Sequence, residues 1–367
     1  MKKPLKLLVN AEPFGFGPTA AMADFFPFLR KNFEHLAFIG GDHCLDLHSG
    51  LNYDAIFDIT NKKETGNSFK KIVSEYDLFF TACNFRRALI AHSLGIPTLL
   101  YDPLSWYWKD IPKQIGNEIL YIAQDFYGVR ELIEGNPQRF QNYKIVPPIA
   151  KKIRSTQNKN LVFVNLGGVQ NPYWSLELST EYAAMMIRAL RSVIPATQEV
   201  IIATSKSVSF RLNDPQVRTY SRDEIESLLL RTKYAAMTPG LANIHTSACH
   251  NIPTLFLPPA NDSQGLQLDT IRQHNLLDEG IDWFQIRPEK IYDYKGNQLA
   301  SLAAISDALI FLKSSDHAMN TFTQLCAGSI ERLNNSHGSA LTKMIEIFGS
   351  GGAESVAEIV TDYAKRI

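Results

Sequence analysis

One stretch of the chain, residues 234–267, constrains the fold more than any other. Its first apolar run ends at Pro239-Gly240, where proline and glycine stop a strand and allow a helix to begin. Residues 241–250 have the length of a helix of about three turns, and after a second proline break 254–257 reads as another buried strand. Such a unit is typical of a parallel α/β sheet, and a helix that starts above the strand ends suits an anionic phosphate.

The segment after that strand, 258–264, reads as a loop in which an acid and an amide, Asp262 and Gln264, lie two residues apart. Such a pair suits the recognition of hydroxyl groups. The order of Gly240, a helix, an Ile-Pro pair, an apolar strand and Asp262-x-Gln264 resembles the donor-sugar motif of GT-B glycosyltransferases. Nearest in pattern are the UDP-glycosyltransferases and the peptidoglycan N-acetylglucosaminyltransferase. The resemblance implies two facing Rossmann-like α/β domains with a cleft between them.

The resemblance also implies where a donor binds. The dipole of the helix that begins near Gly240 would stabilise a leaving diphosphate, so neither a metal ion nor a cofactor is expected. Two positions depart from the family: Thr246 stands where the ribose-binding glutamate is usual, and Asn243 where a small hydroxyl residue is usual. An ordinary Rossmann repeat without a ligand is the alternative. The donor-binding candidates in this stretch are Pro239, Gly240, Asn243, Thr246, Asp262 and Gln264.

A second glycine-rich turn opens the C-terminal half. The apolar run 161–165 predicts a strand, and a Gly-Gly pair follows it. Because glycine has no side chain, backbone N–H groups there can reach a phosphate, and the turn resembles the GT-B loop that faces the donor phosphates and the acceptor. The segment before a predicted helix at 222–231 matches the place where the base is read, and its Ser-x-x-Glu pattern is also a capping box. The donor-binding candidates here are Gly167, Gly168, Gln170, Tyr220 and Ser221.

The N-terminal half begins with a strand at 5–9, a loop at 10–18 and a helix at 19–30. In GT-B transferases this loop carries the acceptor-side base, often a histidine, and the matching position here is Gly15. Glu12 is the best local substitute, because a carboxyl at the end of a strand is where a general base is needed. A solvated or helix-capping acid is the equal alternative. The acceptor-binding candidates of this loop are Phe14, Gly15 and Phe16.

Two further features of this half leave alternatives open. The loop reads GFGPTA, a weak match to the dinucleotide-binding pattern, because its third glycine is alanine and no clear acid ends the second strand. Asp102 follows a strand at 98–101, and Trp106 belongs to an aromatic cluster beside it. Such a cluster can stack a planar or sugar acceptor, or it can simply pack the underside of the domain. A strand at 119–122 is expected to complete the sheet.

Composition narrows the classes of function. Of the 367 residues, 45% are apolar and 20% are charged, as in a folded globular protein. Lys plus Arg equals Asp plus Glu at 37 each, so nothing favours nucleic acid or an anionic membrane surface. Four scattered cysteines indicate buried thiols in a reducing compartment rather than disulfides or a zinc site. No apolar run has the length of a signal segment or a membrane span, so a cytoplasmic location is expected.

The length suits two domains. A double proline at 147–148 and the polar segment 151–159 indicate the boundary. We therefore expect an N-terminal Rossmann-like acceptor domain at 1–150 and a C-terminal Rossmann-like donor domain at 151–300. Residues 301–367 read as a helical C-terminal tail, which returns to the first domain or forms a homodimer contact or a lid.

Taken together, the resemblance implies a metal-independent glycosyltransferase that moves a sugar from a nucleotide-sugar donor, UDP-linked, to a small-molecule acceptor in the interdomain cleft. The run VNAEPFGFGP also resembles bacterial cytosylglucuronate synthase-like proteins, a candidate subfamily. The rivals are a UDP-sugar epimerase or hydrolase of the same fold, a non-catalytic nucleotide-sugar binding protein, and a nicotinamide-dependent oxidoreductase.

Overall fold

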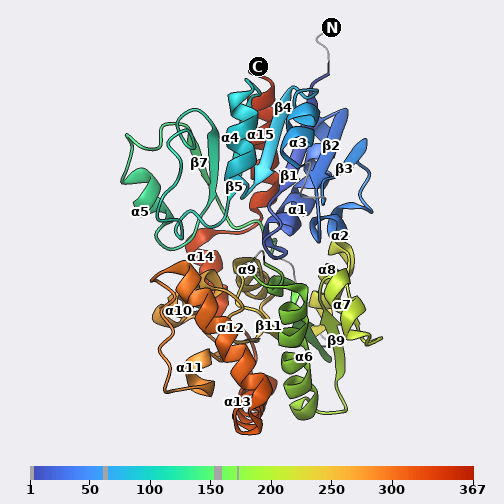
Figure 1. Ribbon diagram of the computed structural model, residues 1–367, viewed down its shortest axis with the longest axis vertical. Helices are drawn as coiled ribbons and strands as arrows, with labels where there is room; N and C mark the ends of the chain where they lie inside the picture. The colour runs from blue at the N-terminus through green and yellow to red at the C-terminus, as the bar shows by residue number, and fades with distance from the viewer. Residues whose placement is uncertain (1–3, 61–64, 153–158, 172) are drawn as a thin grey trace. The chain divides into compact units, whose positions relative to one another are not determined.

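The computed structural model describes residues 4–60, 65–152, 159–171 and 173–367 (Figure 1). The chain forms two compact units: unit 1 comprises Met1–Lys151 and Phe348–Ile367, and unit 2 comprises Lys152–Ile347. Most of the polar segment 151–159, which we expected at the boundary, lies outside the described residues.

Unit 1 is built on a seven-stranded parallel sheet with the order β3-β2-β1-β4-β5-β6-β7. The strands are β1 (Lys6–Ala11), β2 (His35–Gly40), β3 (Ala55–Asp58), β4 (Leu78–Ala82), β5 (Thr98–Asp102), β6 (Leu120–Gln124) and β7 (Tyr143–Val146). The sequence prediction ended this sheet at β6, which is wrong, because β7 pairs with β6 along the edge. An edge strand is half exposed, and its four residues lack the apolar run that marks the central strands.

Helices cover both faces of this sheet. Alternate residues of β1 point to opposite faces, so each face of the strand packs against a different set of helices. Leu7 and Val9 pack with the helices on one face, and Leu8 packs with those on the other. The C-terminal helix α15 lies beside α1 on the first face, far from it in sequence (Figure 1). The helices are α1 (Gly17–Asn32), α2 (Cys44–His48), α3 (Thr65–Val73), α4 (Phe85–Ser93), α5 (Val129–Glu134) and α15 (Gly352–Ala364).

Unit 2 repeats the architecture with a six-stranded parallel sheet of order β10-β9-β8-β11-β12-β13. The strands are β8 (Leu161–Asn165), β9 (Glu199–Ala203), β10 (Val217–Arg218), β11 (Thr232–Met237), β12 (Thr254–Phe256) and β13 (Glu279–Gly280). Its helices are α6 (Leu176–Val193), α7 (Lys206–Leu212), α8 (Arg222–Arg231), α9 (Leu241–His250), α10 (Asp262–Gln273), α11 (Trp283–Ile286), α12 (Gln298–Ser314), α13 (Asp316–Asn334) and, at the boundary with unit 1, α14 (Lys343–Phe348).

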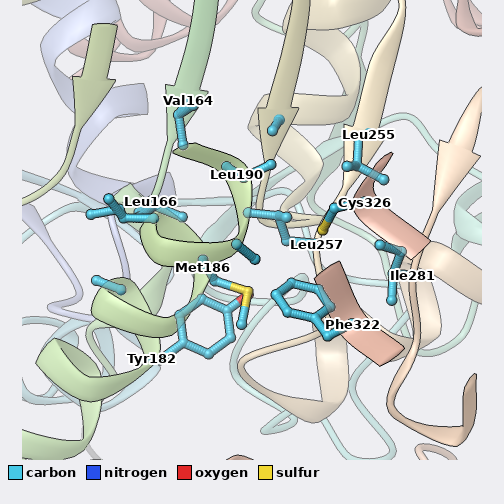
Figure 2. Close-up of a cluster of buried hydrophobic side chains, with 14 of the residues drawn as sticks. Val164, Leu166, Tyr182, Met186, Leu190, Leu255, Leu257, Ile281, Phe322 and Cys326 are labelled. Carbon is cyan, nitrogen blue, oxygen red and sulfur yellow. The ribbon is translucent and has the colours of Figure 1, made fainter. Parts of the chain in front are cut away.

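The main core of unit 2 joins the sheet to α6 and α13. Figure 2 shows Val164 and Leu255 of the sheet above Tyr182 and Met186 of α6 and Phe322 of α13. All five side chains are almost fully buried. The helices that we expected as one tail from 301 onward therefore divide: α12 and α13 belong to unit 2, and α15 belongs to unit 1. None of the described helices is both long and apolar enough to cross a membrane.

Candidate functional site

Both sheets reverse their strand order beside the first strand of the unit. In unit 1, β1 lies between β2 and β4, and in unit 2, β8 lies between β9 and β11. Ligands of open parallel sheets bind at the carboxyl edge where the order reverses, because loops on the two sides diverge there. This places the two candidate sites at the ends of β1 and β4 and at the ends of β8 and β11.

Gly240 lies at the end of β11, as predicted, and begins α9. Its φ of −81° and ψ of 145° are open to any residue, and a Cβ built there would meet nothing within 4 Å. Glycine is also a weaker helix cap than serine, asparagine or aspartate. Neither backbone conformation nor internal packing thus requires glycine at this position. What the glycine leaves is open space in front of the uncapped N–H groups of α9, a suitable arrangement for an anion.

The polar residues behind Gly240 form a hydrogen-bonded bridge between β8 and β11. Asn165 Nδ2 donates to Asn243 Oδ1 at 2.9 Å, and Asn243 Nδ2 donates to the Thr238 carbonyl at 2.9 Å. Asn165 Oδ1 in turn accepts from Gly167 N at 3.0 Å. The amide of Asn243, a predicted donor-binding residue, is therefore used to hold the start of α9 against the end of β8.

The Gly167-Gly168 turn is held in place by Gln264. Gln264 Nε2 donates to the Gly168 carbonyl at 3.1 Å, while Gln264 Oε1 accepts from Ala260 N at 2.8 Å. A Cβ on Gly168 would come within 2.7 Å of Thr238 Oγ1, so glycine is required there for packing. Gln264 is buried and joins two loops, and its role in binding a sugar hydroxyl stays a prediction.

The remaining donor-binding candidates lie around this centre. Asp262 is buried in the first turn of α10, so the predicted loop at 258–264 is wrong at its end. The cause is Asn261, whose Oδ1 accepts from Gln264 N at 2.9 Å and caps α10 directly before Asp262. Thr246 lies half-buried in α9, and Gln170 Oε1 accepts from Ser207 Oγ at 3.2 Å. The position of Pro239, between β11 and Gly240, is as predicted.

The predicted base-reading segment is a helix cap in the structure. Ser221 and Glu224 form a complete capping box at the start of α8, as predicted. Tyr220 is buried, and the Arg218 guanidinium lies 4.3 Å from the centre of its ring. The base contact itself stays a prediction.

Glu12 lies at the reversal point of unit 1. Its backbone N–H donates to the Ala82 carbonyl at 3.0 Å and thereby ties the end of β1 to the end of β4. Burial raises the pKa of the Glu12 carboxyl, while the positive charges of Arg87 and Arg86 oppose that rise. A carboxyl with a raised pKa at a strand end has the properties of a general base.

The loop that follows is fixed by a histidine from elsewhere in the chain. Gly15 has a φ of 59°, a left-handed conformation that favours glycine. His43 Nε2 donates to the Gly15 carbonyl at 2.7 Å, and the Phe16 ring meets the His43 ring edge-on, with centroids 5.6 Å apart. Burial lowers the pKa of His43, so its ring is neutral near pH 7. Phe14 N donates to the Glu12 carbonyl at 2.9 Å, which completes the turn.

Asp102 is completely buried and serves the fold. Its Oδ1 accepts from Leu104 N at 2.8 Å, and its Oδ2 accepts from Trp108 Nε1 at 2.8 Å and from Tyr121 OH at 2.7 Å. Burial raises its pKa to about 6, although the hydrogen bonds favour the ionised form. Both carboxylate oxygens thus bind the chain itself, and the acceptor contact of Asp102 stays a prediction.

Trp106 belongs to an aromatic cluster that packs within unit 1. Its ring lies 5.3 Å from that of Phe126, which in turn lies 5.9 Å from Phe348. Packing, the alternative that the sequence left open, accounts for these contacts.

No family model matches the sequence, and neither does any curated protein. Solved structures do match over nearly the whole chain. The spinosyn rhamnosyltransferase SpnG has a TM-score of 0.50 at 12% identity, covering 98% of this chain and 100% of that one. The calicheamicin glycosyltransferase CalG4 has a TM-score of 0.49 at 10% identity over 100% of both chains. MurG of Acinetobacter baumannii has a TM-score of 0.49 at 11% identity, covering 98% of this chain and 100% of that one.

The chain has the GT-B fold. At such low identity the likeness concerns the fold alone. In this GT-B chain the two reversal points described above are the candidate sites of the two Rossmann-like units.

Three residues at these GT-B reversal points escaped the sequence prediction: Asn165, His43 and Arg87. Asn165 could have been found from the sequence, since a polar side chain ends an otherwise apolar central strand. Arg87 could have been found as well, because two arginines in the first turn of a helix oppose the helix dipole and are therefore unusual. His43 could not have been found from the sequence, because only the fold brings it to Gly15. Among the described residues, no group of three or more His, Cys, Asp or Glu side chains could hold a metal ion.

Proposed function

We propose that this GT-B protein is a glycosyltransferase that moves a sugar from a nucleotide-sugar donor, UDP-linked, to a small-molecule acceptor. The donor diphosphate binds at the start of α9 in unit 2, and the acceptor binds beside Glu12 in unit 1. The observation that carries the proposal is Gly240, a glycine that neither the backbone nor the packing requires and that leaves space before uncapped N–H groups.

Each site has a distinct chemical role in this proposal. The N–H groups and dipole of α9 stabilise the negative charge that develops on the leaving diphosphate, which needs no proton and no metal ion. Glu12 accepts the proton of the acceptor hydroxyl as it attacks the anomeric carbon of the sugar. Its raised pKa increases its basicity relative to an exposed carboxylate.

The first test is a thermal-shift panel of UDP, dTDP, GDP, CMP and several UDP-sugars. A ligand at a hundred times its Kd adds about 2.7 kcal/mol of stability. In Gly240→Asp the added carboxylate repels a diphosphate but caps α9, so the free protein keeps its stability within about 0.5 kcal/mol while losing the nucleotide response. Gly240→Ala is the uncharged control with the same backbone. Nucleotide binding by Gly240→Asp at wild-type strength would contradict the donor site.

The rival functions can be distinguished by the products that they release and by the ligands that they require. A glycosyltransferase forms free nucleoside diphosphate at an appreciable rate only when an acceptor is present, whereas a hydrolase or epimerase turns over without one. A non-catalytic binding protein binds the donor but shows no turnover in either case. An oxidoreductase has to bind NADH, which the same thermal-shift assay tests when NADH is added to the panel.

A further inference from the structure

The loop that carries Glu12 is held by hydrogen bonds to two different elements. Glu12 N donates to the Ala82 carbonyl at 3.0 Å, which fixes the backbone of Glu12 to the end of β4. Beyond Glu12 the chain leaves the sheet, and Gly15 takes up a left-handed conformation with a φ of 59°. The Gly15 carbonyl accepts a hydrogen bond from His43 Nε2 at 2.7 Å. The position of the Glu12 carboxyl therefore depends on the sheet on one side and on His43 on the other.

The sheet beneath Glu12 is braced by polar side chains. Asn10 of the central strand β1 donates from Nδ2 to the Ile39 carbonyl at 2.6 Å, and its Oδ1 accepts from Thr81 Oγ1 at 2.9 Å. Asn10 and Thr81 are both fully buried, and hydrogen bonds are stronger in such surroundings than in water. These bonds join β2, β1 and β4 directly below the loop. This side of the loop is thus held without any contribution from His43.

His43 lies on an equally firm support. It directly precedes α2, and its neighbour Cys44 is fully buried, with Sγ donating to the Ala11 carbonyl at 3.8 Å. Thr19 Oγ1 of α1 donates to the Cys44 carbonyl at 3.3 Å. The His43 side chain is buried, and its ring meets the Phe16 ring edge-on. A side chain that is locked by its own packing can hold a functional loop in place.

The charged and titratable groups that face the Glu12 carboxyl come from three elements. Arg86 and Arg87 act on it from α4, Cys44 lies near it on α2, and Cys83 lies near it at the end of β4. Burial raises the pKa of both thiols, so neither is charged near pH 7. Burial also raises the pKa of the Glu12 carboxyl, and the two arginines oppose that rise. A carboxyl released into water would return toward its ordinary pKa of 4.5.

We propose that His43 is a positioning residue for Glu12, and that its hydrogen bond to the Gly15 carbonyl keeps the Glu12 carboxyl at the reversal point of unit 1. Because a carbonyl oxygen can only accept, this role needs an N–H donor at the position of Nε2 and no positive charge. A misplacement of about 1 Å can lower the rate of a catalysed reaction about 100-fold. That the carboxyl acts as a base rests on the proposed function, whereas its placement by His43 does not.

Two substitutions separate the donor of His43 from its ring. His43→Gln offers an amide N–H near the position of Nε2 without the ring, and His43→Phe keeps a ring beside Phe16 without the donor. His35→Phe, at the exposed start of β2, is the matched control. In the full chain labelled with ¹³C-glutamate, the carboxyl resonance that Glu12→Gln lacks belongs to Glu12. Titrating this resonance by NMR gives the pKa of Glu12 without any turnover.

The pKa of Glu12 is expected to fall toward 4.5 in His43→Phe and to keep its wild-type value in His43→Gln and His35→Phe. We expect kcat to fall about 10- to 100-fold in His43→Phe, with KM for the donor unchanged, and to be largely restored in His43→Gln. A purely structural role would lower stability without moving the pKa of Glu12. The inference is overturned if that pKa is unchanged in His43→Phe, or if His43→Gln behaves like His43→Phe.

Gly15→Ala tests the same contact from the loop and replaces His43→Phe if that variant does not fold. Alanine disfavours the left-handed conformation at this position, so the loop is drawn away from His43. The pKa of Glu12 is again expected to fall toward 4.5, and an unchanged value would overturn the inference. Absence of sugar transfer by the wild type, with the His43-dependent pKa intact, would remove the proposed function alone. Sugar transfer at the wild-type rate by His43→Phe, with the pKa unmoved, would remove the inference alone.

Discussion

Glu12 is subject to two opposing influences. Burial raises the pKa of its carboxyl, and Arg87 and Arg86 act against that rise. Since the folded protein holds the proton of Glu12 more tightly than the unfolded chain, the protonated form contributes stability below about pH 4.5, and this contribution is lost as the pH rises through the raised value. At neutral pH an ionised Glu12 therefore weakens the fold, a pattern expected of a residue kept for chemistry.

We predict that Glu12→Gln lowers kcat by about 10²- to 10⁴-fold, because the amide cannot accept a proton. Donor affinity is unchanged, and the variant is more stable than the wild type at pH 7, with the difference disappearing below about pH 4.5. Wild-type kcat falls as the pH drops through the raised pKa of Glu12. A pH profile of kcat and urea denaturation at pH 4 and 7 check these points. Wild-type turnover by Glu12→Gln would assign Glu12 to its alternative role as a loop acid.

The sequence predicts where a single residue lies when that residue directly follows a clearly marked strand. The positions of Glu12 and Gly240 followed from strands and turns that the sequence marks clearly. The hydrogen bonds of Asp102 and Gln264 to their own chain were not predictable, because a polar residue at a strand end gives no sign of whether it faces solvent or binds its own chain. Arg87 was missed although its charge opposes the dipole of α4, because only the fold brings it near Glu12.

Helix caps set the boundaries of the elements around the sites. We predict that Ser221→Ala lowers the free energy of unfolding by about 1 kcal/mol, because Ser221 Oγ accepts from Glu224 N at the start of α8. Ser227→Ala, in the exposed interior of the same helix, is the control and is expected to be neutral or slightly stabilising. Urea denaturation measures both. If the segment reads the base through its backbone, nucleotide preference in Ser221→Ala is retained, whereas a changed preference would assign a base contact to the side chain.

Elements were predictable where apolar runs and breakers coincide. The helix at 241–250 agrees with α9 at both ends, since a glycine precedes it and Asn251 in a left-handed conformation ends it. Two elements were misplaced for opposite reasons. β7 has only four residues, one of them a lysine, which is too short a run to be recognised as a strand, and α10 begins after two prolines that read as loop. In both cases, contacts with residues that are distant in sequence decide the secondary structure more than the local sequence does.

At the scale of the molecule, the two-unit α/β architecture was predictable from alternating strands and helices. The return of the C-terminal tail to the first domain was one of the expected alternatives, but the division of its helices between the two units was not predictable. Helix α15 buries Ala353, Val356 and Val360 against the sheet of unit 1. Gly352 N donates to the Pro148 carbonyl at 2.9 Å, and a Cβ on Gly352 would come within 2.0 Å of the Pro147 carbonyl oxygen. Helical periodicity reveals an apolar face but not which sheet covers it.

We predict that Val356→Ala lowers the free energy of unfolding by about 2 kcal/mol, from two lost methyl groups and the space they leave. The exposed Glu358→Ala on the same helix is the control and is expected to change stability by less than about 0.5 kcal/mol. Hydrogen exchange followed by mass spectrometry locates the effect. Exchange is expected to speed up in β1 and β4 and to stay unchanged in β8 and β11. Equal acceleration in both sheets would contradict a unit 1 core completed by α15.

The return of α15 to unit 1 has a consequence for biosynthesis. Domains generally fold in the order in which the ribosome releases them, the N-terminal one first. Here all of unit 2, Lys152–Ile347, is made between the last strand of unit 1 and the helix that completes its core. On the nascent chain, α1 already packs on the face of β1 that carries Leu7 and Val9, but the part of this core that α15 completes stays exposed while unit 2 is synthesised. The unit that is begun first is thus the one that is finished last, and in the interval it is a natural client for chaperones.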